Sequence, residues 1–188
     1  MRTAILVLKL AVLAYCSYLL VFLLDRYDPS VPGYSPPFVL WLLDTINLFI
    51  HEAGHLFFKL FGQWLYLLGG SLVQVLIPLA LLIVVWRQNL DQIWYPGFWL
   101  GENLVNVSVY IKDAPYRKLR LLARGLIHDW NWLLNGDQET SEILGATVYW
   151  MGILICAAAI GAGAWFAVKK MREERDERRE NAVKSGEL

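Results

Sequence analysis

The sequence predicts an all-α protein, a polytopic membrane helix bundle of about five spanning helices, on the strength of three observations. Of its 188 residues 57% are hydrophobic and 18% are charged, whereas soluble domains are nearer half apolar and a quarter charged. The apolar residues gather in blocks long enough to cross the roughly 30 Å hydrocarbon core as helices. Short segments rich in Pro, Gly or charge separate the blocks, which favours turns between helices.

We expect a single transmembrane domain over residues 1–168, with spans at about 4–24, 38–61, 64–86, 93–111 and 143–168. The first block is too long for the apolar region of a signal peptide, and DRYDPS follows it in place of a small-residue cleavage site. PSVPGYSPP (29–37) is a loop, because its prolines lack backbone donors. Pro78 is tolerated in a membrane helix, where neighbouring groups satisfy the freed carbonyl. Cys16 and Cys156 each lie in an apolar block, which indicates buried thiols.

The polar residues outside the blocks fall mainly in two segments, 112–140 and the charged tail 169–188. The formal net charge is zero, so we expect no nucleic-acid partner. Five spans would put the termini on opposite sides of the membrane, yet positive charge, which favours the cytoplasmic side, lies near both termini and in 112–124. A short re-entrant segment at 119–135, containing GLIHDWNWLL, would let residues 112–118 share a side with the tail.

The second block contains the sequence HEAGH, in which His51, Glu52 and His55 form an H-E-x-x-H pattern. Residues four apart lie on one face of a helix, with Cβ atoms about 5–6 Å apart. Two imidazoles at that spacing can bind one zinc ion at about 2.0–2.1 Å, and the adjacent glutamate can act as the general base towards a zinc-bound water. Ionisable groups at membrane depth are costly and usually functional, so we predict a zinc site here.

Polar residues recur every three or four positions along the same block, at Asp44, Asn47, His51, His55 and Lys59. Such a stripe faces protein or water rather than lipid. Asp44 or Asn47 could orient a ligand histidine through its second ring nitrogen, although polar residues that only bind helices together are an equal alternative.

A catalytic zinc ion needs a third protein ligand and an open fourth position. The chain has three histidines, and the remaining one, His128, is followed at once by Asp129. We expect His128 as the third ligand, with Asp129 as the alternative; the residue of the pair that does not bind zinc would then support the one that does.

The fourth block carries Asn103, Asn106, Tyr110 and Asp113 at helical spacing. The amides of Asn103 and Asn106 could bind a substrate backbone or stabilise an oxyanion. Hydrogen bonding between helices is again an equal alternative.

Taken together, HEAGH followed by GGSLVQVLIPLALL, WLGENLVNVSVYIKDA and IHDWNWLL resembles the site-2 protease group of intramembrane zinc metalloproteases (M50-type peptidases), most nearly their small M50B-like bacterial relatives. The resemblance covers about residues 38–135. It implies His51 and His55 as zinc ligands, Glu52 as catalytic base and a bacterial inner-membrane location. The chain lacks the N-P-D-G or L-D-G motif that supplies the third ligand in that group; IHDW stands in its place.

The function expected from the sequence is therefore a multi-pass zinc metallopeptidase that hydrolyses peptide bonds of membrane proteins within the lipid bilayer. The alternative is a non-catalytic membrane protein with a structural metal site, acting as a subunit or assembly factor of a larger membrane complex. Closed coordination by four protein ligands, including both His128 and Asp129, would favour the alternative.

Overall fold

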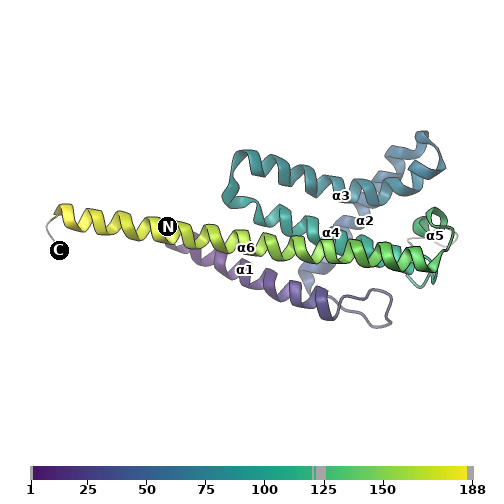
Figure 1. The fold of residues 1–188 in the computed structure, drawn as a ribbon, viewed down its shortest axis with the longest axis horizontal. Coiled ribbons are helices and arrows are strands. Elements are labelled where there is room, and N and C mark those ends of the chain that lie inside the picture. The colour runs from purple at the N-terminus through teal and green to yellow at the C-terminus, as the bar shows by residue number, and fades with distance from the viewer. Residues whose placement is uncertain (1, 120, 122–125, 186–188) are drawn as a thin grey trace.

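The computed structural model describes residues 2–119, 121 and 126–185, and these form helices without any strand (Figure 1). The α-helices are α1 (Arg2–Asp25), α2 (Phe38–Phe58), α3 (Gln63–Gln88), α4 (Trp94–Asp113), α5 (Asp129–Leu133) and α6 (Gln138–Ser185), with 3₁₀ turns η1 (Lys59–Phe61) and η2 (Leu90–Gln92). The all-α class predicted from the sequence is confirmed, and each predicted span lies on a helix.

The expected number of five spans is corrected by the hydropathy of the individual helices. Within the described residues, three helices are long and apolar enough to cross a membrane: Ala4–Asp25 of α1, α3 and α6. Helices α2 and α4 have sufficient length, at 21 and 20 residues. Their polar residues, among them the histidines of α2 and the asparagines of α4, lower their hydropathy. The side chains that suggest a function therefore also weaken the signal for membrane insertion.

The two termini lie at the same end of the molecule (Figure 1). Helix α1 runs antiparallel to α6: a Cβ atom at Gly163 would lie 2.6 Å from Leu13 Cδ2 towards one end, and Tyr149 OH donates to the Leu23 carbonyl at 3.2 Å towards the other. Helix α5 and the loop between α1 and α2 lie at the end opposite the termini (Figure 1). Tyr116, which follows α4, donates to Glu142 near the start of α6, whereas the charged tail forms the other end of α6; the side of the membrane on which each lies stays a prediction.

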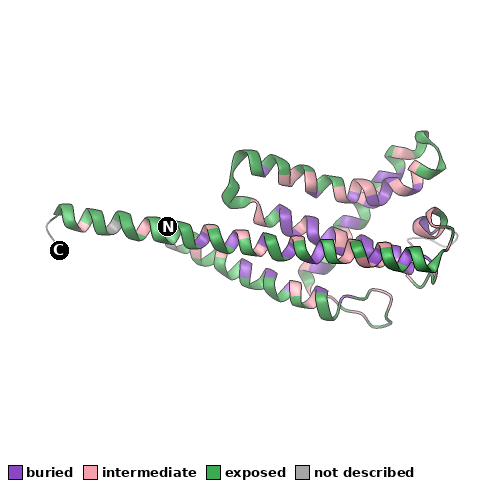
Figure 2. Ribbon diagram, in the orientation of Figure 1, coloured by how far each residue is buried: buried purple, intermediate pink, exposed green. Residues whose placement is uncertain are grey.

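The central contact of the bundle joins α4 to α6 through glycines. A Cβ atom at Gly101 would lie 2.6 Å from both Cys156 Sγ and the Gly152 carbonyl, so the two backbones approach closely only without side chains there. This packing buries Leu19, Leu23 and Val105 with Cys156 in one apolar core. Buried residues lie where helices meet (Figure 2). Many large apolar residues remain exposed, which suits a surface in contact with lipid.

Helix α6 is longer than the predicted span, because it continues through the charged tail to Ser185. Exposed pairs four residues apart, Lys169 with Glu173 and Lys184 with Glu180, lie along this extension. Part of the predicted re-entrant segment 119–135, residues 120 and 122–125, lies outside the described residues. The described part returns to the bundle at α5, where Trp130 Nε1 donates to Ser71 Oγ of α3 at 3.0 Å; its immersion in the membrane stays a prediction.

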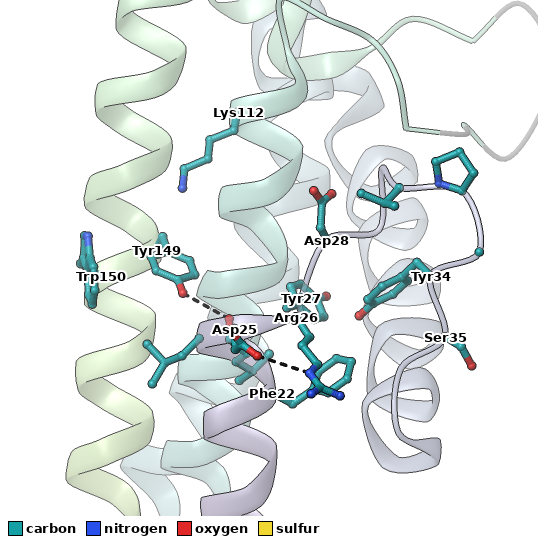
Figure 3. A pocket seen from close by; sticks show the side chains of 15 residues that line it. Phe22, Asp25, Arg26, Tyr27, Asp28, Tyr34, Ser35, Lys112, Tyr149 and Trp150 are labelled. Atoms are coloured by element: carbon teal, nitrogen blue, oxygen red, sulfur yellow. Dashed lines mark hydrogen bonds and ion pairs between the residues drawn. The ribbon is translucent and has the colours of Figure 1, made fainter.

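A cavity of about 770 Å³ lies beside the loop that joins α1 to α2 (Figure 3). Asp25 and Arg26 form an exposed ion pair at its edge, and Lys112 Nζ lies 4.7 Å from the centre of the Tyr149 ring (Figure 3). None of the predicted metal ligands is among the described residues that line this cavity, so it is separate from the candidate site described next.

Candidate metal centre

The close crossing of α2 and α3 places both histidines of HEAGH against α3. A Cβ atom at Gly54 would collide with the Gly69 carbonyl, and one at Gly69 would lie 2.7 Å from the Phe58 ring. Glycines at these two positions let the helices touch backbone to backbone. His51 and His55, on the same face of α2 as Gly54, are consequently buried between α2, α3 and α5.

The ring nitrogens of both histidines converge on one carboxylate oxygen. Asp129 Oδ2 lies 3.0 Å from His51 Nε2 and 3.2 Å from His55 Nε2. All three residues are buried, and their ligand atoms lie within 4.8 Å of one another. This cluster can hold a metal ion. The distances are close to the separation of roughly 3.3 Å that two ligand atoms adopt on a tetrahedral zinc ion with bonds of about 2.0–2.1 Å.

The second nitrogen of each imidazole is engaged with a hydrogen-bond acceptor. His51 Nδ1 lies 3.1 Å from Gln74 Oε1, and His55 Nδ1 lies 2.7 Å from the Tyr66 carbonyl. Because carbonyl oxygens only accept, each Nδ1 carries a hydrogen, and in the neutral ring the Nε2 lone pair is then free. A cation bound at this point would satisfy both lone pairs and the carboxylate together, which makes the cluster suitable for a metal ion.

Gly70 leaves space beside these ligand atoms. A Cβ atom on Gly70 would lie 2.6 Å from His51 Nε2 and 2.7 Å from His55 Nε2. Any side chain there would compete with an ion bound between the two nitrogens. The glycine pair at 69–70 thus serves both the helix crossing and the metal centre, and the residues present fit a metal ion.

Of the two candidates for third ligand, the structure brings Asp129 to the histidines and directs His128 elsewhere. His128 Nδ1 accepts from the Asn131 backbone at 3.2 Å and so caps α5, while His128 Nε2 donates to Asp113 Oδ2 at 3.2 Å. Asp113 also accepts from the backbone nitrogens of Lys118 and Leu119 at 2.8 and 3.0 Å. His128 therefore holds the start of the helix whose first residue is the metal-facing aspartate.

The electrostatics of His128 agree with its role. Burial lowers the pKa of His128 despite its contact with Asp113, which favours the neutral ring that can accept the Asn131 hydrogen bond.

The other predicted site residues divide between contacts of helices and the wall of a cavity beside His51, His55 and Asp129, called here the metal cavity. Asn47 donates to Glu102 Oε2 at 2.9 Å and accepts from Trp99 Nε1 at 3.0 Å, so it joins α2 to α4. Asn103 donates to the Trp99 carbonyl at 3.0 Å and does not line the metal cavity. Asp44 and Asn106 do line it, hydrogen-bonded to each other at 2.9 Å.

A cavity of about 530 Å³ adjoins the metal centre. Glu52, half-buried, lies in its wall together with His51, His55 and Asp129. Tyr110 also lines the cavity, and its hydroxyl accepts from the Asp129 backbone at 3.2 Å. The remaining wall is mainly apolar, including Leu48, Leu67, Val107, Leu121, Leu126 and Ile127. An apolar cavity with a few convergent polar groups is the usual form of a binding site.

Sequence reasoning missed the role of Gln74, which is only 2% exposed and bonds His51. A lone amide within the apolar run of α3 was the available signal, because polar groups at membrane depth need partners. It also missed Gly70, whose importance appears only when the packing of α2 on α3 is known.

No protein-family model, curated protein or solved structure matches this chain. The chemistry proposed below therefore rests on the residues at the metal centre.

Proposed function

We propose that this chain is a membrane-embedded zinc metallopeptidase that hydrolyses peptide bonds of membrane proteins. The observation that carries the proposal is the convergence of His51 Nε2, His55 Nε2 and Asp129 Oδ2, with Glu52 in the wall of the same cavity. Two imidazoles and one carboxylate are a ligand set that suits zinc. The H-E-x-x-H spacing places a carboxylate next to the first ligand without making it a ligand.

The roles of the residues follow from their positions. Bound zinc would polarise a water molecule and the carbonyl of the scissile bond. The Glu52 carboxylate, in the cavity wall, takes the proton of the attacking water and returns it to the leaving amine. His51, His55 and Asp129 hold the metal, and the hydrogen bonds at both Nδ1 atoms fix the direction of the two imidazoles. Tyr110, through its bond to the Asp129 backbone, helps to hold the third ligand.

The number of ligands favours catalysis over the alternative, a structural metal site in a subunit or assembly factor. A structural zinc is closed by four protein ligands, whereas a catalytic zinc keeps one position for water or substrate. The metal-binding group found among the described residues has three members, and His128 is paired with Asp113 instead of joining them.

The substrate class follows from the surroundings of the centre. The cavity is largely apolar, and the outer faces of α1, α2 and α3 carry exposed apolar side chains, which suit a lipid bilayer. A membrane segment entering the cavity must be locally unwound, because a helix hides its carbonyls in its own hydrogen bonds. The bacterial inner membrane, implied by the resemblance to site-2 proteases, is the location we propose.

The test uses the full chain purified in detergent without chelators. We expect about one zinc per chain in the wild type and in Glu52→Gln, and little in Asp129→Ala. The wild type should cleave quenched fluorescent peptides of apolar sequence in detergent micelles, and Glu52→Gln should not. A Glu52→Gln variant that cleaves as fast as the wild type would refute Glu52 as the base, and a metal-free wild type would refute the zinc centre.

A further inference from the structure

A continuous line of hydrogen bonds connects a carboxylate on α2 to a metal-facing histidine through α4 and α3. Asn106 Nδ2 donates to Asp44 Oδ1 at 2.9 Å, Gln74 Nε2 donates to Asn106 Oδ1 at 2.9 Å, and Gln74 Oε1 lies 3.1 Å from His51 Nδ1. These four side chains, called here the Asp44 relay, run along the wall of the metal cavity.

Asp44 determines which end of each amide in the relay donates a hydrogen bond and which end accepts one. Asp44 Oδ1 accepts from both Tyr27 OH at 2.6 Å and Asn106 Nδ2 at 2.9 Å. With its amide nitrogen committed to Asp44, Asn106 presents its oxygen to Gln74. Gln74 must then turn its nitrogen to Asn106 and its oxygen to His51. An oxygen only accepts, so the His51 hydrogen is held on Nδ1 and the Nε2 lone pair faces the metal position.

Tyr27 reinforces the anchor at the far end. Its hydroxyl donates to Asp44 and accepts from Asn106 Nδ2 at 2.8 Å, so the Asn106 amide has two acceptors on one side. An inverted Asn106 would place its oxygen against Asp44 Oδ1, an acceptor facing an acceptor. The orientation of both amides is thereby fixed by one carboxylate and one phenol that lie outside the metal centre.

We infer that Asp44 is a positioning residue of the metal centre, which selects the metal-binding tautomer of His51 through Asn106 and Gln74. This inference rests on the metal centre of the proposed function, and it extends that centre by two helices. A carboxylate usually orients a metal-bound histidine directly. Here the side-chain amides of Asn106 and Gln74 lie between the carboxylate and the histidine and transmit the orientation through hydrogen bonds.

A second buried acid provides a matched control. Glu102 is fully buried on α4, and its Oε2 accepts from Asn47 Nδ2 at 2.9 Å, a bond that leads to Trp99 and away from both histidines. Glu102 also interacts directly with Asp44, but it is not one of the four side chains of the relay, so Glu102→Gln removes a carboxyl group from the same polar interior without giving Asn106 a new donor at position 44. Both Glu102→Gln and Asp44→Asn are isosteric. Only Asp44→Asn lets the relay invert, because an asparagine at that position can donate as well as accept.

The experiment measures zinc affinity of the detergent-purified full chain by competition with a chromophoric chelator. We expect Asp44→Asn to bind zinc 10- to 100-fold more weakly, the range found for residues that support metal ligands, and Glu102→Gln to bind within about twofold of wild type. The double variant Asp44→Asn with Gln74→Glu should recover wild-type affinity within about threefold. In that variant the carboxylate introduced on α3 only accepts from His51, and an inverted Asn106 can bridge this carboxylate and the amide introduced on α2.

A second readout reports the tautomer itself. In metal-free protein labelled with ¹⁵N-histidine, the chemical shifts of the ring nitrogens distinguish Nδ1–H from Nε2–H, and the chain has only three histidines. We expect His51 to be the Nδ1–H form in the wild type and to shift towards Nε2–H in Asp44→Asn. Equal zinc affinities of Asp44→Asn and wild type, equal losses in Asp44→Asn and Glu102→Gln, or failure of the double variant to recover would each overturn the inference. A wild type without zinc would count against the proposed function, whereas the tautomer readout would still decide the role of Asp44.

Discussion

A methyl group at position 70 tests the metal centre with the smallest change that the chain allows. Gly70 lies on α3, and a Cβ atom there would approach the Nε2 atoms of His51 and His55 to 2.6 and 2.7 Å. We expect Gly70→Ala to abolish zinc binding while helix α3 remains formed. The variant alters none of the ligands and no hydrogen-bonding side chain, so the loss would arise from occupied space alone.

The size of the effect follows from the distances. An ordinary carbon contact needs about 3.4 Å, so both rings must retreat by about 0.7 Å. Zinc–ligand distances tolerate departures of about 0.2 Å, which is several times smaller than that displacement. The affinity for zinc should therefore fall by more than the roughly 10- to 100-fold that follows loss of a supporting residue. Helix propensity works the other way, since Ala favours a helix over Gly by about 1 kcal/mol.

The assay compares zinc content and far-ultraviolet circular dichroism of wild type, Gly70→Ala and a control. Gly161→Ala is the matched control, because a Cβ atom at Gly161 of α6 would meet open space. We expect one zinc per chain in the control and near none in Gly70→Ala, with equal helical content. Wild-type zinc affinity in Gly70→Ala would show that the ion does not bind between His51 and His55, and the reasoning would be wrong.

Three further outcomes are expected. Asp129→Ala should lose zinc, whereas His128→Ala should keep it with about fivefold lower affinity, because the loss of a helix cap costs about 1 kcal/mol; equilibrium dialysis with zinc distinguishes the two. Hydrogen bonds from Thr140 hold the pKa of Asp137 below its ordinary value, so its stabilising contribution is present above the unfolded pKa of about 3.9 and is lost as pH falls through the folded pKa. Thermal unfolding of Asp137→Asn between pH 5 and 3 should accordingly depend less on pH than that of the wild type. Removal of zinc by a chelator should leave the helical content unchanged, because the α4–α6 core contains no metal ligand; extensive loss of dichroism would contradict this.

The positions of the helices were predictable because apolar runs and their breaks decide them. Pro37 precedes α2 and Gly62, with a positive φ of 88°, precedes α3, close to the predicted starts. The extent of α6 was not predictable from hydropathy, since its last third is charged. That region forms helix through residues of good propensity and pairs at i and i+4, features that a search for apolar blocks passes over.

Only the two metal ligands that lie on one helix, His51 and His55, could be predicted firmly from the sequence. The spacing of His51 and His55 follows from helical geometry, and both side chains lie where that geometry requires. The choice between His128 and Asp129 could not be made from the sequence. The side chains of adjacent residues point in different directions, and the sequence does not show which of the two faces α2. The decisive local feature is that His128 caps α5, a role that Ser, Thr, Asp or Asn more often takes.

The partners of the ligands explain why an apolar helix can carry HEAGH at all. A buried polar group without a partner is costly in an apolar environment, and three such groups on one helix would destabilise the bundle severely. Within the described residues, the buried side-chain atoms without a partner are Tyr34 OH, Trp94 Nε1, Glu102 Oε1 and Asn103 Oδ1. No atom of His51, His55, Asp129 or the Asp44 relay is among them. The polar residues of α2, α3 and α4 that line the metal cavity thus find hydrogen-bond partners on neighbouring helices. Stability and orientation have the same physical origin here: the hydrogen bonds at the two Nδ1 atoms help to make burial of the histidines tolerable, and they also direct both Nε2 atoms towards Asp129.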